Sequence, residues 1–161
     1  MIIEQLIVSF FAAVGFAVIF NAPVNVLWQS GTVGMVGWIV FVVLSRIYDT
    51  NVVVATLIAS VVVGIVSQIL AKRFRTPIII FNLAGIIPLV PGGLSYDTMR
   101  LFVVNEFDAA IATGATVAMI SGAIALGLIF SEIINQLIRN MNWRKYQSEY
   151  DRKGVARLEG D

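Results

Sequence analysis

The sequence contains no cysteine and no histidine. Disulfide frameworks, thiol nucleophiles, metal sites built on these side chains and Ser-His-Asp catalysis are therefore excluded from this chain. The other titratable residues cannot assemble an acid–base pair at a shared membrane depth, so we expect no enzymatic activity. We also predict no cofactor and no metal ion.

Charged residues are scarce as well: they make up 13% of the 161 residues, whereas 58% of the residues are hydrophobic. Average soluble domains carry about 25% charged residues. The net charge is +1 without a basic face interleaved with aromatics, so the sequence offers no electrostatic basis for nucleic-acid binding. The mean hydropathy of +0.89 instead indicates a lipid bilayer as the surrounding medium.

Long apolar runs make up most of the sequence. A run of about 20 residues crosses a hydrocarbon core of roughly 30 Å, and such runs recur along most of the chain. The sequence therefore predicts an all-α, polytopic membrane protein with about five transmembrane helices. Turn and breaker residues delimit the apolar segments Ile2–Phe20, Thr32–Ile47, Val52–Ala71, one that starts at Pro77, and Ala109–Ile138.

The two ends of the chain differ in character. The first segment carries Glu4 where a signal peptide has a basic region, so we interpret it as a retained helix. Residues 141–161 are polar and charged, and we expect a cytoplasmic tail whose last residues are disordered. Residues 1–140 form the predicted transmembrane domain.

Basic residues decide whether the fourth segment crosses the membrane or turns back. Lys72, Arg73 and Arg75 follow the third segment, and a second basic cluster begins at Arg139. If the fourth segment crosses, both clusters face the cytoplasm, as the positive-inside rule requires; if it re-enters, they lie on opposite sides. We therefore predict five crossings, with the N-terminus outside and the C-terminus inside.

The fourth segment is interrupted by the stretch "IIPLVPGG", residues Ile86–Gly93. The 13 residues of Ile78–Val90 form about 20 Å of helix, which is shorter than the hydrocarbon core. Pro88 to Gly93 is therefore either a surface turn before an interfacial helix that begins near Ser95, or a break inside a membrane helix. A break frees backbone polar groups, which a bilayer tolerates only where they are buried in protein or line a water-filled path. Discontinuous helices of this kind build substrate sites in many transporters.

Polar residues on both sides of this stretch are candidates for a substrate pathway, because polar groups at membrane depth usually face protein or water. Asp97 and Arg100, three residues apart, could alternatively pair only with each other on a helix face. Asn21 and Pro23 would lie on the opposite side of the membrane, where they could line the same path but not the same compact site. The candidate pathway residues are Asn21, Pro23, Asn82, Pro88, Pro91, Gly92, Gly93, Tyr96 and Arg100.

Small residues repeat at four-residue spacing in two segments, which is the usual device for close helix packing in lipid. The hydroxyls of such stripes mostly bond back to their own helix, and a substrate-lining role of the third-segment stripe is the alternative. The predicted packing residues are Thr56, Ser60 and Gly64 in the third segment and Gly114, Ala118 and Gly122 in the fifth.

Glu132 is the only acidic residue inside the apolar run of the fifth segment. Its carboxylate could bind and release a proton and so couple proton movement to transport. The alternative is that the side chain only reaches the cytoplasmic interface.

Two motifs occur in the first and fourth segments: "AVGFAVIFNAPV" (Ala13–Val24) and "IIPLVPGGLSY" (Ile86–Tyr96). In this order and helical context they resemble the threonine/serine exporter family. The resemblance covers about residues 2 to 140 and is closest to the small-subunit branch, which corresponds to the C-terminal five-helix half of the fused exporters. The matching positions are Gly15, Phe16, Asn21, Pro23, Pro88, Pro91 and Gly92, with weaker matches at Gly93 and Tyr96.

The resemblance implies secondary transport of a small carboxylate-bearing metabolite, threonine, serine or a dicarboxylate such as succinate, out through a bacterial or archaeal cell membrane. It also implies a larger membrane subunit of the same family as partner. Five helices with few intramembrane charges favour assembly with such a partner, with further copies of the chain, or both. The substrate carboxylate could meet free N–H groups of the half-helix after Gly93, or Arg100. The alternative function is a structural subunit that assembles a membrane complex without touching substrate.

Overall fold

The computed structural model describes the backbone of residues 2–158 and the side chains of residues 3–139. All regular structure in this part of the chain is helical, which confirms the all-α prediction. The elements are α1 (Ile2–Ile19), the 3₁₀ turn η1 (Val24–Val26), α2 (Leu27–Val42), the π-helical η2 (Val43–Ile47), α3 (Val52–Phe74), α4 (Ile78–Ile86), the 3₁₀ turn η3 (Ile87–Leu89), α5 (Gly92–Val103) and α6 (Phe107–Leu158).

Three described helical segments are long and apolar enough to cross a membrane: Val24–Ile47, Val52–Phe74 and Phe107–Arg139. Ile78–Leu89 and Gly92–Val103 form a pair bent by 55°, which makes a fourth span if the two helices act together. The apolar part of α1, Ile3–Ile19, is shorter than these spans. The number of five crossings and their orientation stay predictions.

The second apolar span begins earlier than the sequence indicated. Helical structure starts at Val24, directly after Pro23, and not at Thr32. The reason is that polar residues before Thr32 are accommodated inside the helix. Ser30, for example, is fully buried, and its hydroxyl donates to the Val26 carbonyl at 3.0 Å.

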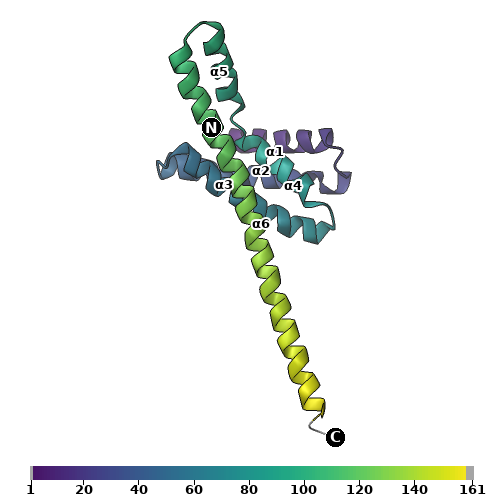
Figure 1. Cartoon of the computed structure of the whole chain (residues 1–161). Coiled ribbons are helices and arrows are strands. Elements are labelled where there is room, and N and C mark those ends of the chain that lie inside the picture. Colours follow the sequence, from purple (N-terminus) through teal and green to yellow (C-terminus); the bar gives the residue numbers. More distant parts are fainter. Residues whose placement is uncertain (1, 159–161) are drawn as a thin grey trace.

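The last helix is also longer than predicted. α6 continues as one helix through the predicted domain boundary near residue 140 and ends at Leu158, so the polar tail up to that residue is helical (Figure 1). The final residues of the chain, which we expected to be disordered, lie outside the described residues.

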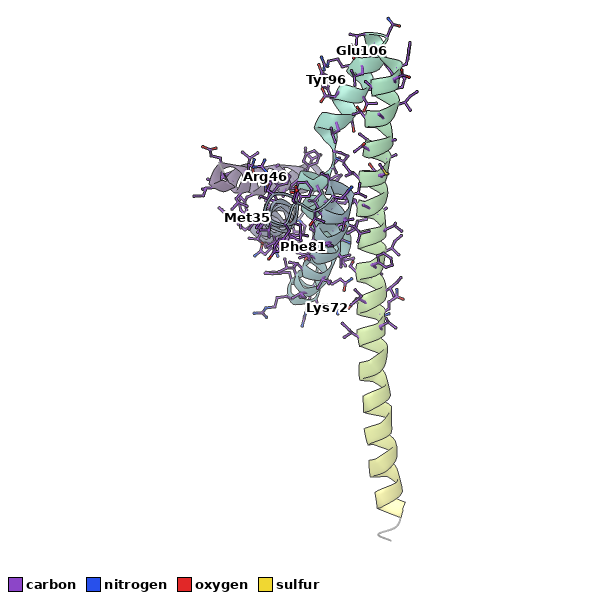
Figure 2. The ribbon with its side chains drawn as sticks, turned by 90° about the vertical axis from the view of Figure 1, so that its left-hand side faces the viewer. Met35, Arg46, Lys72, Phe81, Tyr96 and Glu106 are labelled. Carbon is purple, nitrogen blue, oxygen red and sulfur yellow. The ribbon has the colours of Figure 1, made fainter. Side chains whose placement is uncertain are left out.

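Helices α1 to α4 form a compact block against which the middle of α6 packs (Figure 1). Its core joins α2, α3, α4 and α6, and Phe81 is the largest fully buried side chain, lying inside the block in Figure 2. Glycines bring the helices close together: a Cβ at Gly34 would lie 2.6 Å from the Ala13 Cβ, and one at Gly37 would lie 2.5 Å from the Val63 Cγ2. Larger side chains at these positions would push α2 away from α1 and α3.

Helices α3 and α6 run parallel, because residue numbers rise together along their contact. The Ser60 hydroxyl lies 3.4 Å from the Ala123 carbonyl, and further along the Gln68 side-chain amide donates to the Ser131 carbonyl at 2.9 Å. Lys72 then donates to Asn135 Oδ1 at 2.8 Å. The chain must therefore return along this axis between the end of α3 and the start of α6, and α4, η3 and α5 make that return. A segment that turned back to the side where α3 ends would instead have made α6 antiparallel to α3.

The remaining part of the fold is a hairpin of α5 and the first turns of α6, which we call the arm. The arm projects from the block, with α5 packed almost solely on α6 (Figure 1). Phe102 and Phe107 stack edge to face across its tip, with ring centroids 6.1 Å apart. Several large apolar side chains on the arm are exposed, including Met99 (66%) and Val103 (78%).

Candidate functional site

The stretch singled out in the sequence joins the block to the arm. α4 ends at Ile86, η3 continues to Leu89, and Val90 is extended, with φ −64° and ψ 128°. The Gly92 N–H donates to the Val90 carbonyl at 2.8 Å around Pro91, which makes a tight turn. α5 begins directly afterwards with no side chain capping its first N–H groups. The stretch is thus a short joint between two helices bent by 55°.

The two glycines of this joint are not required by its backbone. No glycine in the described chain has a positive φ. A Cβ placed on Gly92 or Gly93 would meet no other atom within 4 Å. These two glycines therefore do not supply a backbone conformation that other residues avoid. What glycine provides at these positions is uncovered backbone at the start of α5.

Two candidate residues lie on the arm. Tyr96 is 69% exposed and stands apart from the block in Figure 2. Arg100 Nε lies 3.7 Å from Asp97 Oδ1, which is the local helix-face pair that we considered as the alternative to a substrate role. Neither residue is brought close to the block. A pathway role for them would therefore require a second protein surface beside the arm.

Pro88 lies in a cavity of about 320 Å³ between α1, α2 and η3. The walls are mainly apolar, but two of the lining residues carry a covered polar atom that has no hydrogen-bond partner in the described structure: Gln5 Oε1 and Trp38 Nε1. Unpaired buried donors and acceptors are rare in proteins because each costs about 1–3 kcal/mol. The residues lining the cavity are Glu4, Gln5, Val8, Ser9, Ala12, Trp38, Ile87 and Pro88.

The sequence reasoning missed Gln5 and Trp38. Each is a side chain with a polar group inside a long apolar segment, and this is the signal that could have identified them. Their shared cavity depends on the crossing of α1 and α2, which no pattern within one segment reveals.

Asn82 lies in α4, one turn before Gly85, and is half buried. Its Oδ1 is buried and has no partner among the described residues, and the same holds for Ser67 Oγ on α3. Asn82 therefore belongs to the block and not to the cavity at Pro88.

Asn21 and Pro23 are exposed at the turn between α1 and α2. Asn21 adopts a left-handed conformation with φ 56°, which asparagine tolerates better than most residues. α1 separates this turn from the cavity residues Glu4 and Gln5, so Asn21 and Pro23 are not brought together with Pro88.

Glu132 lines a second cleft, of about 290 Å³, between the end of α3, the start of α4 and α6. The side chain is exposed, and its two carboxylate oxygens accept hydrogen bonds from Gln68 at 3.4 Å and from Gln136 at 3.3 Å. The carboxylate is thus held by neutral amides at the mouth of a cleft. Proton coupling by Glu132 stays a prediction.

The two predicted small-residue stripes differ in burial. Thr56, Ser60 and Gly64 are all buried on α3, with Ser60 and Gly64 facing α6. On α6, Gly114 packs against Thr98 of the arm. Ala118 and Gly122 are exposed, so a packing role for these two could only concern a surface outside this chain.

The contact between α3 and α6, which we call the seam, is built on its α6 side from a different set of small residues, which the sequence reasoning missed. A Cβ on Gly127 would overlap Ser60 Oγ, and a Cβ on Gly64 would overlap Ser131 Oγ. Each glycine therefore accommodates a serine of the opposite helix. Ala123, Gly127 and Ser131 have the same four-residue spacing as the stripe we chose, which is why the pattern alone could not distinguish them.

No group of three or more acidic side chains in the described structure is placed to hold a metal ion. The site consists of a joint, a cavity with unpaired polar atoms and a cleft with charges of both signs.

Comparison with known proteins identifies the family. The family model described as "Threonine/Serine exporter, ThrE" matches residues 5–134. An uncharacterized protein of Haemophilus influenzae is 31% identical over 124 residues, which cover 72% of this chain and 41% of that protein. The chain thus spans about two fifths of the length of this relative, and no solved structure matches it. The family is one of membrane transporters and not of enzymes, and the extent of the match shows that this chain belongs to the threonine/serine exporter family.

Proposed function

We propose that this chain is the small membrane subunit of a secondary exporter that moves threonine and serine, or dicarboxylates such as succinate, out of the cytoplasm. The observation that carries the proposal is the cavity at Pro88, beside the joint between α4 and α5. Gln5 and Trp38 line this cavity, and a polar permeant would supply the hydrogen bonds that Gln5 Oε1 and Trp38 Nε1 lack once these covered atoms turn toward it. Otherwise, two unpaired polar atoms in a mainly apolar cavity only cost stability.

The proposed orientation, with the N-terminus outside and the C-terminus inside, rests on the parallel course of α3 and α6. Lys72, Arg73 and Arg75 end α3, and the hydrogen bond from Lys72 to Asn135 sets them beside the part of α6 that leads to Arg139. Both basic clusters therefore lie at one end of the molecule. The positive-inside rule assigns this end to the cytoplasm of the cell membrane.

The proposed partner is the larger membrane subunit of the same family, with further copies of this chain as an additional possibility. Two observations support assembly. The relative from Haemophilus influenzae is more than twice as long as the matched part, and the arm projects from the block with apolar side chains exposed along it. Tyr96 and Arg100 lie on the arm, where a partner that covers it would bring them next to a second protein surface.

Export from loaded cells tests the proposal. Cells that keep the larger subunit but lack this chain should lose efflux of threonine, serine or succinate, and expression of this chain should restore it. Unchanged efflux of all three solutes without the chain would refute the proposal.

A structural subunit that only assembles the complex is the second candidate, and the exposed arm favours it. Substitution of Trp38 by phenylalanine separates the two functions, because it removes the buried unpaired N–H of a cavity residue while keeping an aromatic ring. Lost efflux with normal recovery of the complex from mild detergent would support transport. Lost recovery of the complex would support the structural role.

A further inference from the structure

We infer that the cleft at the end of the α3–α6 seam binds a zwitterionic α-amino acid, with the substrate carboxylate on Lys72 and the substrate ammonium on Glu132. This inference rests on the proposed export function and names the substrate class that the complex takes up from the inner side. It favours amino acids over dicarboxylates.

The cleft has room for a small solute and is formed by residues of three helices and the turn between two of them. Its volume of about 290 Å³ is far above the roughly 10–15 Å³ that a single water needs. Gln68 and Lys72 come from α3, Thr76 and Ile78 from the turn into α4, and Glu132 and Asn135 from α6. Because α3 and α6 mesh through Ser60, Gly64, Gly127 and Ser131, the two charged side chains are mounted on a rigid pair of helices.

The charges in the cleft are opposite in sign, but they do not neutralise each other. No ion pair joins Lys72 and Glu132 in the described structure, although both side chains line the same cleft. The Lys72 ammonium donates to Asn135 Oδ1 at 2.8 Å, and the Glu132 carboxylate accepts from the amides of Gln68 and Gln136. Each charged group is thus hydrogen-bonded to neutral amide groups, Lys72 on α3 and Glu132 on α6, and within the described residues the two are not paired with each other.

A ligand that carries one positive and one negative group satisfies both charges together. An α-amino acid does so with its ammonium and carboxylate, which charge-assisted hydrogen bonds would hold at the two ends of the cleft. A dicarboxylate would place its second negative group near Glu132, and this repulsion discriminates against it. Lys72 lies at the basic end of α3, beside α6 in Figure 2, which is the cytoplasmic end in the proposed orientation.

The test measures export by the full chain together with its larger subunit, with L-threonine and succinate as substrates. We expect Lys72→Gln and Glu132→Gln each to raise the KM for L-threonine about tenfold, the effect of losing one charge-assisted hydrogen bond to the ligand. Arg73→Gln is the matched control, because Arg73 is an exposed neighbour that does not line the cleft. The amount of each variant in the membrane is measured in parallel.

Analogues that lack one charge assign the two ends of the cleft. L-threonine methyl ester, which has no carboxylate, should inhibit the wild type and the Lys72→Gln variant equally. N-acetyl-L-threonine, which has no ammonium, should inhibit the wild type and Glu132→Gln equally. We expect Glu132→Lys to shift preference from L-threonine toward succinate.

The outcomes separate this inference from the export function on which it rests. If the wild type exports neither substrate, the proposed function fails. If the wild type exports but both variants keep the wild-type KM, the cleft is not a zwitterion site. The same conclusion holds if each variant weakens the binding of threonine and of both analogues to the same extent. A variant that does not reach the membrane is replaced by Lys72→Arg or Glu132→Asp, which retain the charge. These variants should keep the wild-type preference for threonine over succinate. Reversal of that preference would also contradict the inference.

Discussion

Two regions of the molecule contain glycines that looked alike in the sequence, but the structure uses them differently. In the seam between α3 and α6, Gly64 and Gly127 each face a serine of the opposite helix, where a Cβ would overlap the hydroxyl. At the joint between α4 and α5, Gly92 and Gly93 have open space around them and negative φ angles. Glycine in the seam is explained by packing, whereas glycine at the joint is not.

We therefore connect the seam glycines with the stability of the fold and the joint glycines with export. The seam fixes α6 on the block and so positions Glu132 beside Lys72 in the cleft. The joint instead exposes the first N–H groups of α5, and its Pro88 borders the cavity with the unpaired atoms of Gln5 and Trp38. Substitutions in the seam should therefore change folding, and substitutions at the joint should change export.

The largest effect is expected for Gly127→Ala. The new methyl group would overlap Ser60 Oγ and lie 2.8 Å from the Leu57 carbonyl oxygen, a backbone atom that cannot rotate away. Such overpacking costs about 1–3 kcal/mol, so the midpoint of unfolding in a denaturing-detergent titration should fall. Gly122→Ala, on the same helix in open space, is the control and should leave the midpoint unchanged or raise it. Equal effects of the two substitutions would contradict the meshing of α3 with α6.

The smallest effect on stability is expected for the double substitution Gly92→Ala and Gly93→Ala. Both residues are helical and unobstructed, so alanine should maintain or raise the free energy of unfolding, by about 0.4–1 kcal/mol per site at most. Export should nevertheless fall, because methyl groups would cover backbone N–H groups that a substrate carboxylate can approach. A lower unfolding midpoint in the same titration would show that packing does require glycine at the joint.

Much of the fold could be predicted from the sequence because its signals are local. Asn51 marks the start of α3 and accepts a hydrogen bond from the Val53 N–H at 2.9 Å, and Pro88 and Pro91 mark the end of α4. The two family motifs also lie at helix ends, one at the turn after α1 and the other at the joint. The basic end of α3 likewise predicted the return of the chain through α4 and α5.

The contacts between helices could not be predicted in the same way. These helices are apolar on most sides, so hydrophobic periodicity does not show which face of one meets which face of another. Ala118 and Gly122 were therefore as good candidates for the seam as Gly127 and Ser131. The pairing of Gln5 with Trp38 around one cavity depends on the crossing of α1 and α2, which only the assembled block defines.

The most direct test of the export path is Trp38→Phe, which removes the unpaired N–H but keeps an aromatic ring in the cavity wall. The KM for L-threonine export should rise about two- to tenfold, as expected for one lost hydrogen bond of roughly 0.5–1.5 kcal/mol. The unfolding midpoint should stay the same or rise, because a buried donor without a partner is removed. Trp28→Phe is the matched control, since Trp28 is 72% exposed and lies outside the cavity. Wild-type export kinetics in Trp38→Phe would contradict a substrate path through this cavity.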